Sequence, residues 1–306
     1  MKSMIALLLV LFALGTLLLV MTLRSSWVAE GAIQSLTHHG SHQAILPPSP
    51  DYELVSLQTK DGTQIFAQLG RAKDRTGALR PDYRLQPVAI YFYPGGGTMR
   101  WSVPQFEGLR RLGLNVIMPE YPGYGMSNGH ATESGFYAAA DAAYDYAQGR
   151  VDVSHAGILA VGWSLGGSTA VDLASRRPTI GLILLGTSTT FADIVHNLSV
   201  THPFLSWLGG PLLARIGAMV KLDSVAKIPS VSCPILLIRG TGDELISREM
   251  TDRLIAAVQA KVTFLPVEGA GHFNLFRAGG PRLWQAIGEW TSQTISPAAG
   301  APPGKQ

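Results

Sequence analysis

Charge is scarce in this sequence. Asp, Glu, Lys and Arg make up only 15% of the 306 residues, whereas hydrophobic residues make up 46%. Disordered segments are rich in charge and poor in apolar side chains, so this composition excludes disorder over most of the chain. The length suits one large α/β domain with appendages.

Clustered basic residues and cysteine pairs are also missing. The formal net charge of +3 is spread without any run of Lys or Arg, which excludes a nucleic-acid binder. Cys233 is the only cysteine, so no intrachain disulfide can form, and its place in an apolar run predicts burial. His38, His39 and His42 lack further ligands or a rigid element, so we expect a solvated spacer there rather than a metal site.

A long apolar stretch, by contrast, opens the chain. No charged residue occurs from Ser3 to Leu23, and a helix of about 20 apolar residues crosses a bilayer core. The stretch is longer than the apolar region of a signal peptide, and a poor cleavage site follows it. Residues 1–24 are therefore predicted to be an uncleaved transmembrane anchor, with a cleaved signal peptide or a buried core helix as alternatives. Lys2 precedes the stretch, so the positive-inside rule predicts a membrane protein whose remaining chain is extracytoplasmic.

Two segments flank the predicted domain at residues 51–292. Residues 25–50 are polar and end in Pro47-Pro48-Ser49-Pro50, which predicts a linker. Residues 293–306 are rich in Pro, Ala and Gly and are predicted to be a flexible tail.

Strand and helix patterns alternate within the domain. The turn Lys60-Asp61-Gly62 predicts a hairpin, and apolar residues at helical spacing predict a helix over 131–148. This order predicts an α/β fold with a mostly parallel sheet flanked by helices. Residues 188–230 show no strand pattern, and an insertion of this size suits a helical lid over a site. The predicted strands are 52–58, 64–69, 87–93, 114–119, 157–161, 180–185, 234–239 and 262–267.

A candidate nucleophile follows the strand at 157–161. Gly162-Trp163-Ser164-Leu165-Gly166 matches G-x-S-x-G between this strand and a helix-compatible run. Such a serine stands on a sharp strand-to-helix turn, where flanking glycines avoid clashes and the hydroxyl is exposed at the sheet edge. Ser164 is therefore the predicted nucleophile.

A base and an acid are predicted at the same sheet edge. A serine hydroxyl needs a base to take its proton, and His272 follows the strand at 262–267. Asp243 follows the strand at 234–239 and is the predicted acid, with its neighbour Glu244 as the competitor. Carboxyl ends of parallel strands share one edge, where ligands bind, and the chain order Ser, Asp, His is typical of the strand–turn–helix serine motif.

Two backbone amides are predicted to stabilise the oxyanion. One belongs to Leu165, the residue after the nucleophile. The other comes from the loop Pro94-Gly95-Gly96-Gly97, where glycines allow a close approach of the backbone. Gly96 is the predicted second donor, with Gly95 as the alternative.

Further motifs occur at Tyr121-Pro122-Gly123-Tyr124-Gly125-Met126-Ser127 and at residues 223–229, besides the apolar N-terminal stretch, the glycine loop 94–97, the motif 162–167, Asp243-Glu244 and Gly271-His272. On these motifs, residues 51–292 resemble the α/β-hydrolase superfamily, and within it the membrane-anchored serine hydrolases of the abhydrolase domain-containing type. Relatives of that type include acyl-lipid hydrolases and protein depalmitoylases. The sequence departs from the common pattern in having Pro94-Gly95 in place of His-Gly and Phe273-Asn274 after the histidine.

The resemblance implies an α/β-hydrolase fold with a helical lid, and a serine hydrolase that needs no metal or organic cofactor. In such families the loop 121–127 mainly supports the site. Residues 202–220 are rich in apolar side chains, which suits a lid packed on the core, an acyl-chain pocket or a membrane-touching surface. The predicted substrate is therefore a small-molecule or lipid carboxylic ester or thioester, cleaved through an acyl-enzyme. A serine peptidase or amidase of the same fold is one alternative, and a non-catalytic membrane-tethered binding module is another.

Overall fold

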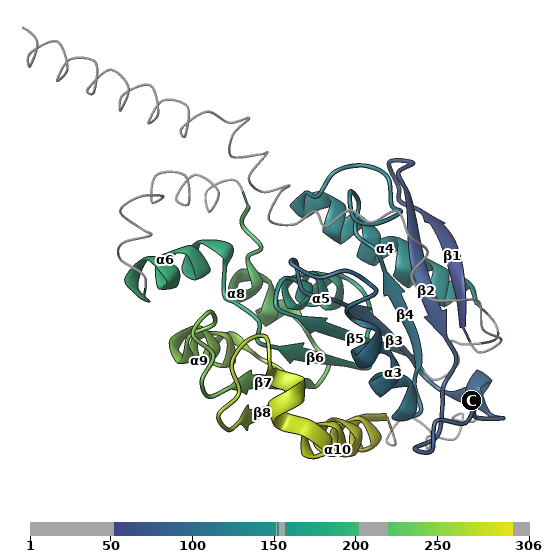
Figure 1. The fold of residues 1–306 in the computed structure, drawn as a ribbon. Helices are drawn as coiled ribbons and strands as arrows, with labels where there is room; N and C mark the ends of the chain where they lie inside the picture. The colour runs from purple at the N-terminus through teal and green to yellow at the C-terminus, as the bar shows by residue number, and fades with distance from the viewer. Residues whose placement is uncertain (1–51, 151, 153–156, 202–219, 296–306) are drawn as a thin grey trace, which may run out of the picture.

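The computed structural model describes residues 52–150, 152, 157–201 and 220–295 (Figure 1). An eight-stranded sheet runs through its centre in the order β1-β2-β4-β3-β5-β6-β7-β8. The pairs β1–β2 and β2–β4 are antiparallel, and all the others are parallel. The strands are β1 (Tyr52–Gln58), β2 (Gln64–Gly70), β3 (Val88–Phe92), β4 (Asn115–Pro119), β5 (Ile158–Trp163), β6 (Gly181–Leu185), β7 (Ile235–Gly240) and β8 (Val262–Val267).

Helices cover both faces of the sheet. In Figure 1, α3 and α10 lie below the sheet, and α4, α5, α8 and α9 lie above it or to its left. The indole of Trp284 in α10 packs directly on Gly108 of α3, which fixes these two helices side by side. The helices are α3 (Val103–Arg111), α4 (Glu133–Gly149), α5 (Leu165–Arg176), α6 (Phe191–Thr201), α8 (Ser224–Lys227), α9 (Arg248–Ala257) and α10 (Leu275–Ile295), with short 3₁₀ turns η1 (Tyr83–Leu85) and η2 (Ile228–Ser230).

The central strands are buried on both faces. Every residue of β3, β4, β5, β6 and β7 is buried. Parallel strands covered by helices on both sides lose the apolar–polar alternation of a half-exposed strand. The continuous apolar runs in the sequence reflect this burial.

The chain changes direction at strand β3. From β3 it passes through α3 to β4 on one side, and from β4 through α4 to β5 on the other side of β3. The loops that follow β3 and β5 therefore leave neighbouring strands in opposite directions. In open α/β sheets a binding crevice lies at such a switch point.

The predicted fold class is confirmed. The hairpin at residues 60–62 joins β1 and β2, and the predicted strands match the observed ones to within two residues at each end. Helix α4 begins at Glu133 rather than 131, because the Thr132 side chain caps it by accepting a hydrogen bond from the Gly135 amide. Helix α10 continues to Ile295, past the predicted domain end at 292.

The predicted insertion at 188–230 is only partly described. Its described residues, 188–201 and 220–230, form α6, α8 and η2 and contain no strand. The apolar residues at 202–219, on which the predicted acyl-chain pocket depends, lie outside the described residues. The predicted linker at 25–50 and the histidines within it lie outside them too.

The predicted membrane anchor needs correction. Among the residues that the structure describes, no helix is both long enough and apolar enough to span a bilayer. The prediction of a single-pass membrane protein with an extracytoplasmic domain is therefore wrong on this finding. It rested on the length of the apolar stretch, the poor cleavage site after it and the positive-inside rule, all applied to residues 1–29, which lie outside the described residues.

Candidate active site

Ser164 stands on a sharp turn between β5 and α5. Its backbone dihedral angles are φ 57° and ψ −121°, a strained conformation for a residue with a side chain. Its amide donates to the Leu185 carbonyl of β6 at 2.9 Å. A methyl group on Gly162 would overlap the Gly166 carbonyl, and one on Gly166 would overlap the Phe92 carbonyl of β3. The glycines of G-x-S-x-G are thus required by backbone contacts.

His272 reaches Ser164 from the loop after β8. Its Nε2 atom lies 3.0 Å from Ser164 Oγ. The histidine is 6% exposed, whereas the serine is half-buried. The imidazole is therefore held away from bulk water while the hydroxyl remains accessible.

Asp243 holds the other side of the imidazole. Its Oδ2 atom lies 2.9 Å from His272 Nδ1, and its Oδ1 atom accepts hydrogen bonds from the amides of Leu245 and Ile246 at 3.0 and 2.8 Å. Both carboxylate oxygens are therefore occupied. Glu244, the competing candidate, has an exposed side chain, so of the two carboxylates it is Asp243 that contacts the histidine.

Two residues that the sequence did not single out shape this pair. The buried guanidinium of Arg239 donates to the carbonyls of Ile246 and Asp243. It thereby fixes the loop after β7 that carries Asp243 (the acid loop). Burial lowers the pKa of Arg239. Gly186, after β6, has φ 49°, and a methyl group there would lie 3.3 Å from both Asp243 Oδ2 and His272 Nδ1.

The loop 94–97 lies against the first residue of α5. A methyl group on Gly95 would come 2.9 Å from the Leu165 side chain. The Leu165 amide is in the first turn of α5, where N–H groups have no acceptor within the helix. Gly97 donates to the Pro94 carbonyl at 2.9 Å, which closes the loop as a turn. Gly96 is exposed, with open space where a side chain would stand.

The loop after β4 packs beneath the glycine loop. The Tyr121 hydroxyl donates to the Tyr93 carbonyl at 2.9 Å, and the Tyr124 hydroxyl donates to the Gly95 carbonyl at 2.8 Å. Both tyrosines are buried, and burial holds the pKa of Tyr121 well above its usual value. The expectation that residues 121–127 support the site agrees with these contacts.

A buried carboxylate organises that supporting loop. Glu120 is 1% exposed, and its Oε2 atom accepts hydrogen bonds from the amides of Met126 and Ser127 at 2.7 and 3.1 Å. A methyl group on Gly125 would overlap this carboxylate, so the loop can wrap tightly around it. Burial raises the pKa of Glu120 to about 7, although the two amides oppose the shift.

Helix α6 of the insertion is tied to the acid loop. The Asn197 side chain donates to the carbonyls of Glu244 and Leu245. Asp193 forms an ion pair with Arg253 of α9 at 3.1 Å. These contacts link the described start of the insertion to the loop that carries Asp243.

A large groove lies elsewhere on the domain. It has a volume of about 980 Å³ and runs between α3 and α10, with Trp284 and Leu112 in its wall. Ser164, Asp243 and His272 do not line this groove. The candidate site is therefore defined by its reactive side chains and not by the volume of this groove. Within the described ranges, no group of three or more His, Cys, Asp or Glu side chains could hold a metal ion.

Comparison with curated proteins gives two informative relatives, although no family model matches the chain. An uncharacterised protein of Mycobacterium tuberculosis is 33% identical over 186 residues, which are 61% of this chain and 63% of that protein. The match thus spans less than two thirds of the relative's length. The alpha/beta hydrolase domain-containing protein WAV2 of Arabidopsis thaliana is 27% identical over 76% of each chain.

Solved structures share the fold. An esterase from Pyrococcus furiosus superposes with a TM-score of 0.67 over 82% of this chain and 96% of its own, at 15% identity. A puromycin-hydrolysing peptidase from Mycobacterium tuberculosis gives a TM-score of 0.60 over 82% of this chain and 42% of its own, at 19% identity. At such identities the likeness concerns the fold. The sheet order, the strand–turn–helix at Ser164 and these solved structures show that the chain has the α/β-hydrolase fold.

Proposed function

We propose that this protein is a serine hydrolase in which Ser164 is the nucleophile, His272 the general base and Asp243 the acid that orients the base. The observation that carries the proposal is the pair of hydrogen bonds through one imidazole, 3.0 Å to Ser164 Oγ and 2.9 Å to Asp243 Oδ2. A carboxylate beside Nδ1 keeps the proton on that nitrogen, which leaves Nε2 able to accept the serine proton.

The reaction has two half-steps. Ser164 Oγ attacks the substrate carbonyl carbon while its proton moves to His272 Nε2, and the carbonyl oxygen becomes an oxyanion that the amides of Leu165 and Gly96 stabilise. Collapse of this intermediate expels the leaving group, which takes the proton from His272, and an acyl-serine remains. A water molecule then attacks the acyl carbon by the same route, which releases the acid and restores Ser164.

The proposed substrate is a carboxylic ester or thioester with an acyl chain, processed by the domain at residues 51–292. Phe273 follows the base directly, and its ring lies 5.0 Å from the imidazole between centroids. It is 81% exposed, so it offers an apolar surface beside the reactive groups. An apolar surface at that place favours an acyl chain over a charged substrate. The esterase among the structural neighbours supports the same class.

A substrate panel tests the proposal. We expect the full-length protein to hydrolyse p-nitrophenyl butyrate and a butyryl thioester, and Ser164→Ala to lower both rates by about 10³-fold or more. Faster turnover of a peptide p-nitroanilide than of either ester would favour a peptidase. No turnover of any of the three by the unmodified protein would favour a binding module, and full activity of Ser164→Ala would remove Ser164 from the mechanism.

A further inference from the structure

The buried hydroxyl of Tyr124 contacts the peptide unit that carries the proposed second oxyanion donor. It donates to the Gly95 carbonyl oxygen at 2.8 Å. The Gly95 carbonyl and the Gly96 amide belong to one planar peptide group. The described residues contain no cis peptide bond, and in a trans peptide the N–H points opposite to the C=O. A hydrogen bond that fixes the carbonyl therefore fixes the direction of the Gly96 N–H as well.

We propose that Tyr124 is a positioning residue that aims the Gly96 amide at the oxyanion. This inference rests on the proposed function of Ser164. Glycines impose little conformational preference of their own, so the run 95–97 cannot fix its peptide planes by sterics. Gly96 has open space where a side chain would stand, and the turn bond from Gly97 to Pro94 closes the loop without binding the Gly95 carbonyl. The hydroxyl supplies the missing constraint.

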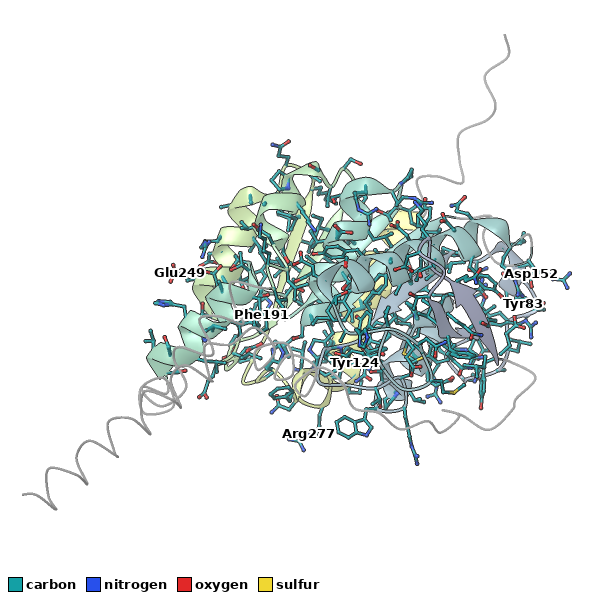
Figure 2. The ribbon with its side chains drawn as sticks, turned by 90° about the horizontal axis from the view of Figure 1, so that it is seen from above. Tyr83, Tyr124, Asp152, Phe191, Glu249 and Arg277 are labelled. Carbon is teal, nitrogen blue, oxygen red and sulfur yellow. The ribbon has the colours of Figure 1, made fainter. Side chains whose placement is uncertain are left out.

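Tyr124 is itself held firmly. Its side chain is 1% exposed, and its ring packs edge-on against Tyr121 and Phe136 with centroids 5.4 and 6.3 Å apart. Gly123 and Gly125 flank it with φ of 79° and 46°, conformations that bulky residues avoid. In the view of Figure 2, Tyr124 lies between Phe191 and Tyr83 from left to right, and lower than both.

The hydrogen bond also acts on the donor strength of the amide. A carbonyl that accepts a hydrogen bond polarises its peptide group, which makes the N–H of the same group a better donor. Charge on the substrate oxygen develops only as Ser164 attacks, so the contribution of this amide is largest in the transition state. Loss of the hydroxyl is therefore expected to lower kcat more than it raises KM.

Tyr124→Phe tests the proposal, because it removes the hydroxyl and keeps the ring. Two matched changes accompany it. Tyr144→Phe removes a hydroxyl bond of the same length, 2.8 Å, to the Pro178 carbonyl. Tyr121→Phe removes the bond to the Tyr93 carbonyl, whose peptide group has no N–H because Pro94 follows. All three proteins are compared with the unmodified chain in thermal melting, in hydrolysis of p-nitrophenyl butyrate and in inhibition by an alkyl boronic acid, which forms an anionic tetrahedral adduct with an active serine.

We expect Tyr124→Phe to lower kcat about tenfold, as for the loss of one hydrogen bond, with KM changed less than twofold and boronate affinity reduced in parallel with kcat. Tyr144→Phe should retain the original rate, and Tyr121→Phe should lose less than threefold. Unchanged kcat and boronate affinity in Tyr124→Phe would overturn the positioning role alone. An equal loss in Tyr121→Phe would overturn it too, because general loosening of the loop would then explain both. Absence of Ser164-dependent turnover in the unmodified protein would instead refute the proposed function, and this inference with it.

Discussion

The loops after β3 and β5 leave neighbouring strands, yet they are held in different ways. The turn after β5 is packed against backbone, because a side chain at Gly162 would overlap main-chain atoms of Gly166, and one at Gly166 would overlap those of Phe92 in β3. The loop after β3 has open space at Gly96 and is held by the Tyr124 hydroxyl, 29 residues away along the chain from Gly95. Local sterics thus fix the nucleophile, while a distant side chain holds the loop of the proposed oxyanion donor.

The two loops are therefore disrupted by different kinds of substitution. A turn fixed by steric exclusion is disrupted by adding atoms, and the cost appears as lost stability. A loop fixed by a hydrogen bond is disrupted by removing atoms, and the cost appears in the reaction that the loop serves. Substitutions in the two loops should therefore differ in whether they lower the stability of the protein or the rate of the reaction.

The largest effect is expected at the acid loop, which is also held by hydrogen bonds. Asp243→Asn replaces the carboxylate beside His272 Nδ1, so the imidazole can take the wrong tautomer. We expect kcat for p-nitrophenyl butyrate to fall about 10⁴-fold with little change in melting temperature. Glu244→Gln is the matched control and should change kcat less than twofold. The reverse order of the two effects would assign the acid to Glu244.

A pair of glycine substitutions contrasts the two loops directly. Gly166→Ala places a methyl group into the Phe92 carbonyl, so we expect the free energy of unfolding to fall by about 3 kcal/mol or more. Gly96→Ala meets open space and should change it by less than about 0.5 kcal/mol. Urea unfolding of both variants measures this. Equal losses at the two positions would show that the loops are not held differently.

The buried carboxylate under the Tyr124 loop predicts a pH dependence of stability. The folded pKa of Glu120, about 7, lies above its ordinary value of 4.5, so between these pH values the folded protein keeps a proton that the unfolded chain has lost. The free energy of unfolding therefore falls as the pH rises from about 4.5 to about 7, and Glu120 contributes up to about 3 kcal/mol to this fall.

Glu120→Gln removes the titrating group and should flatten that part of the curve relative to the unmodified protein. Chemical unfolding at pH 5, 6, 7 and 8 measures the difference. Parallel curves for the two proteins would contradict the raised pKa and leave the loop held by its amide bonds alone.

The smallest effect is expected where α6 meets the acid loop. Asn197→Ala removes the donor to the carbonyls of Glu244 and Leu245, while the amides that hold Asp243 remain. We expect kcat to fall two- to fivefold, consistent with the loss of hydrogen bonds at a half-buried side chain. Ser199→Ala, which removes a bond within α6, is the control and should retain full activity. A loss above 100-fold in Asn197→Ala would mean that α6 contributes directly to the reaction.

The same contrast explains what the sequence could predict. The turn at Ser164 was predictable because steric exclusion forces glycine at fixed spacing, and a fixed spacing is visible in a sequence. The strands were predictable because burial on both faces requires continuous apolar runs. The carboxyl ends of those strands then placed Asp243 and His272 near Ser164, as the structure has them.

Residues whose partners lie far away in the sequence show no fixed spacing or apolar run that would predict their role. Tyr124 was visible only as part of the loop motif at 121–127, and Glu120, which directly precedes that motif, was not singled out at all. The partners of both residues are set by the folded structure and not by a fixed spacing. Arg239 in β7 and Gly186 just after β6 lie beside the acid–base pair, and nothing in their sequence neighbourhood indicates this. Hydropathy, which predicted the strands, was also the main basis for the membrane anchor, for which the described residues gave no support.

Covalent labelling of the full-length protein tests the central claim most directly. A fluorophosphonate reacts with a serine only where a base activates it and donors stabilise the adduct, and peptide mass mapping locates the modified residue. The account predicts a single stoichiometric adduct on the peptide containing Ser164, absent in His272→Ala and slowed in Asp243→Asn. An adduct on another residue, or none on the folded protein, would contradict it.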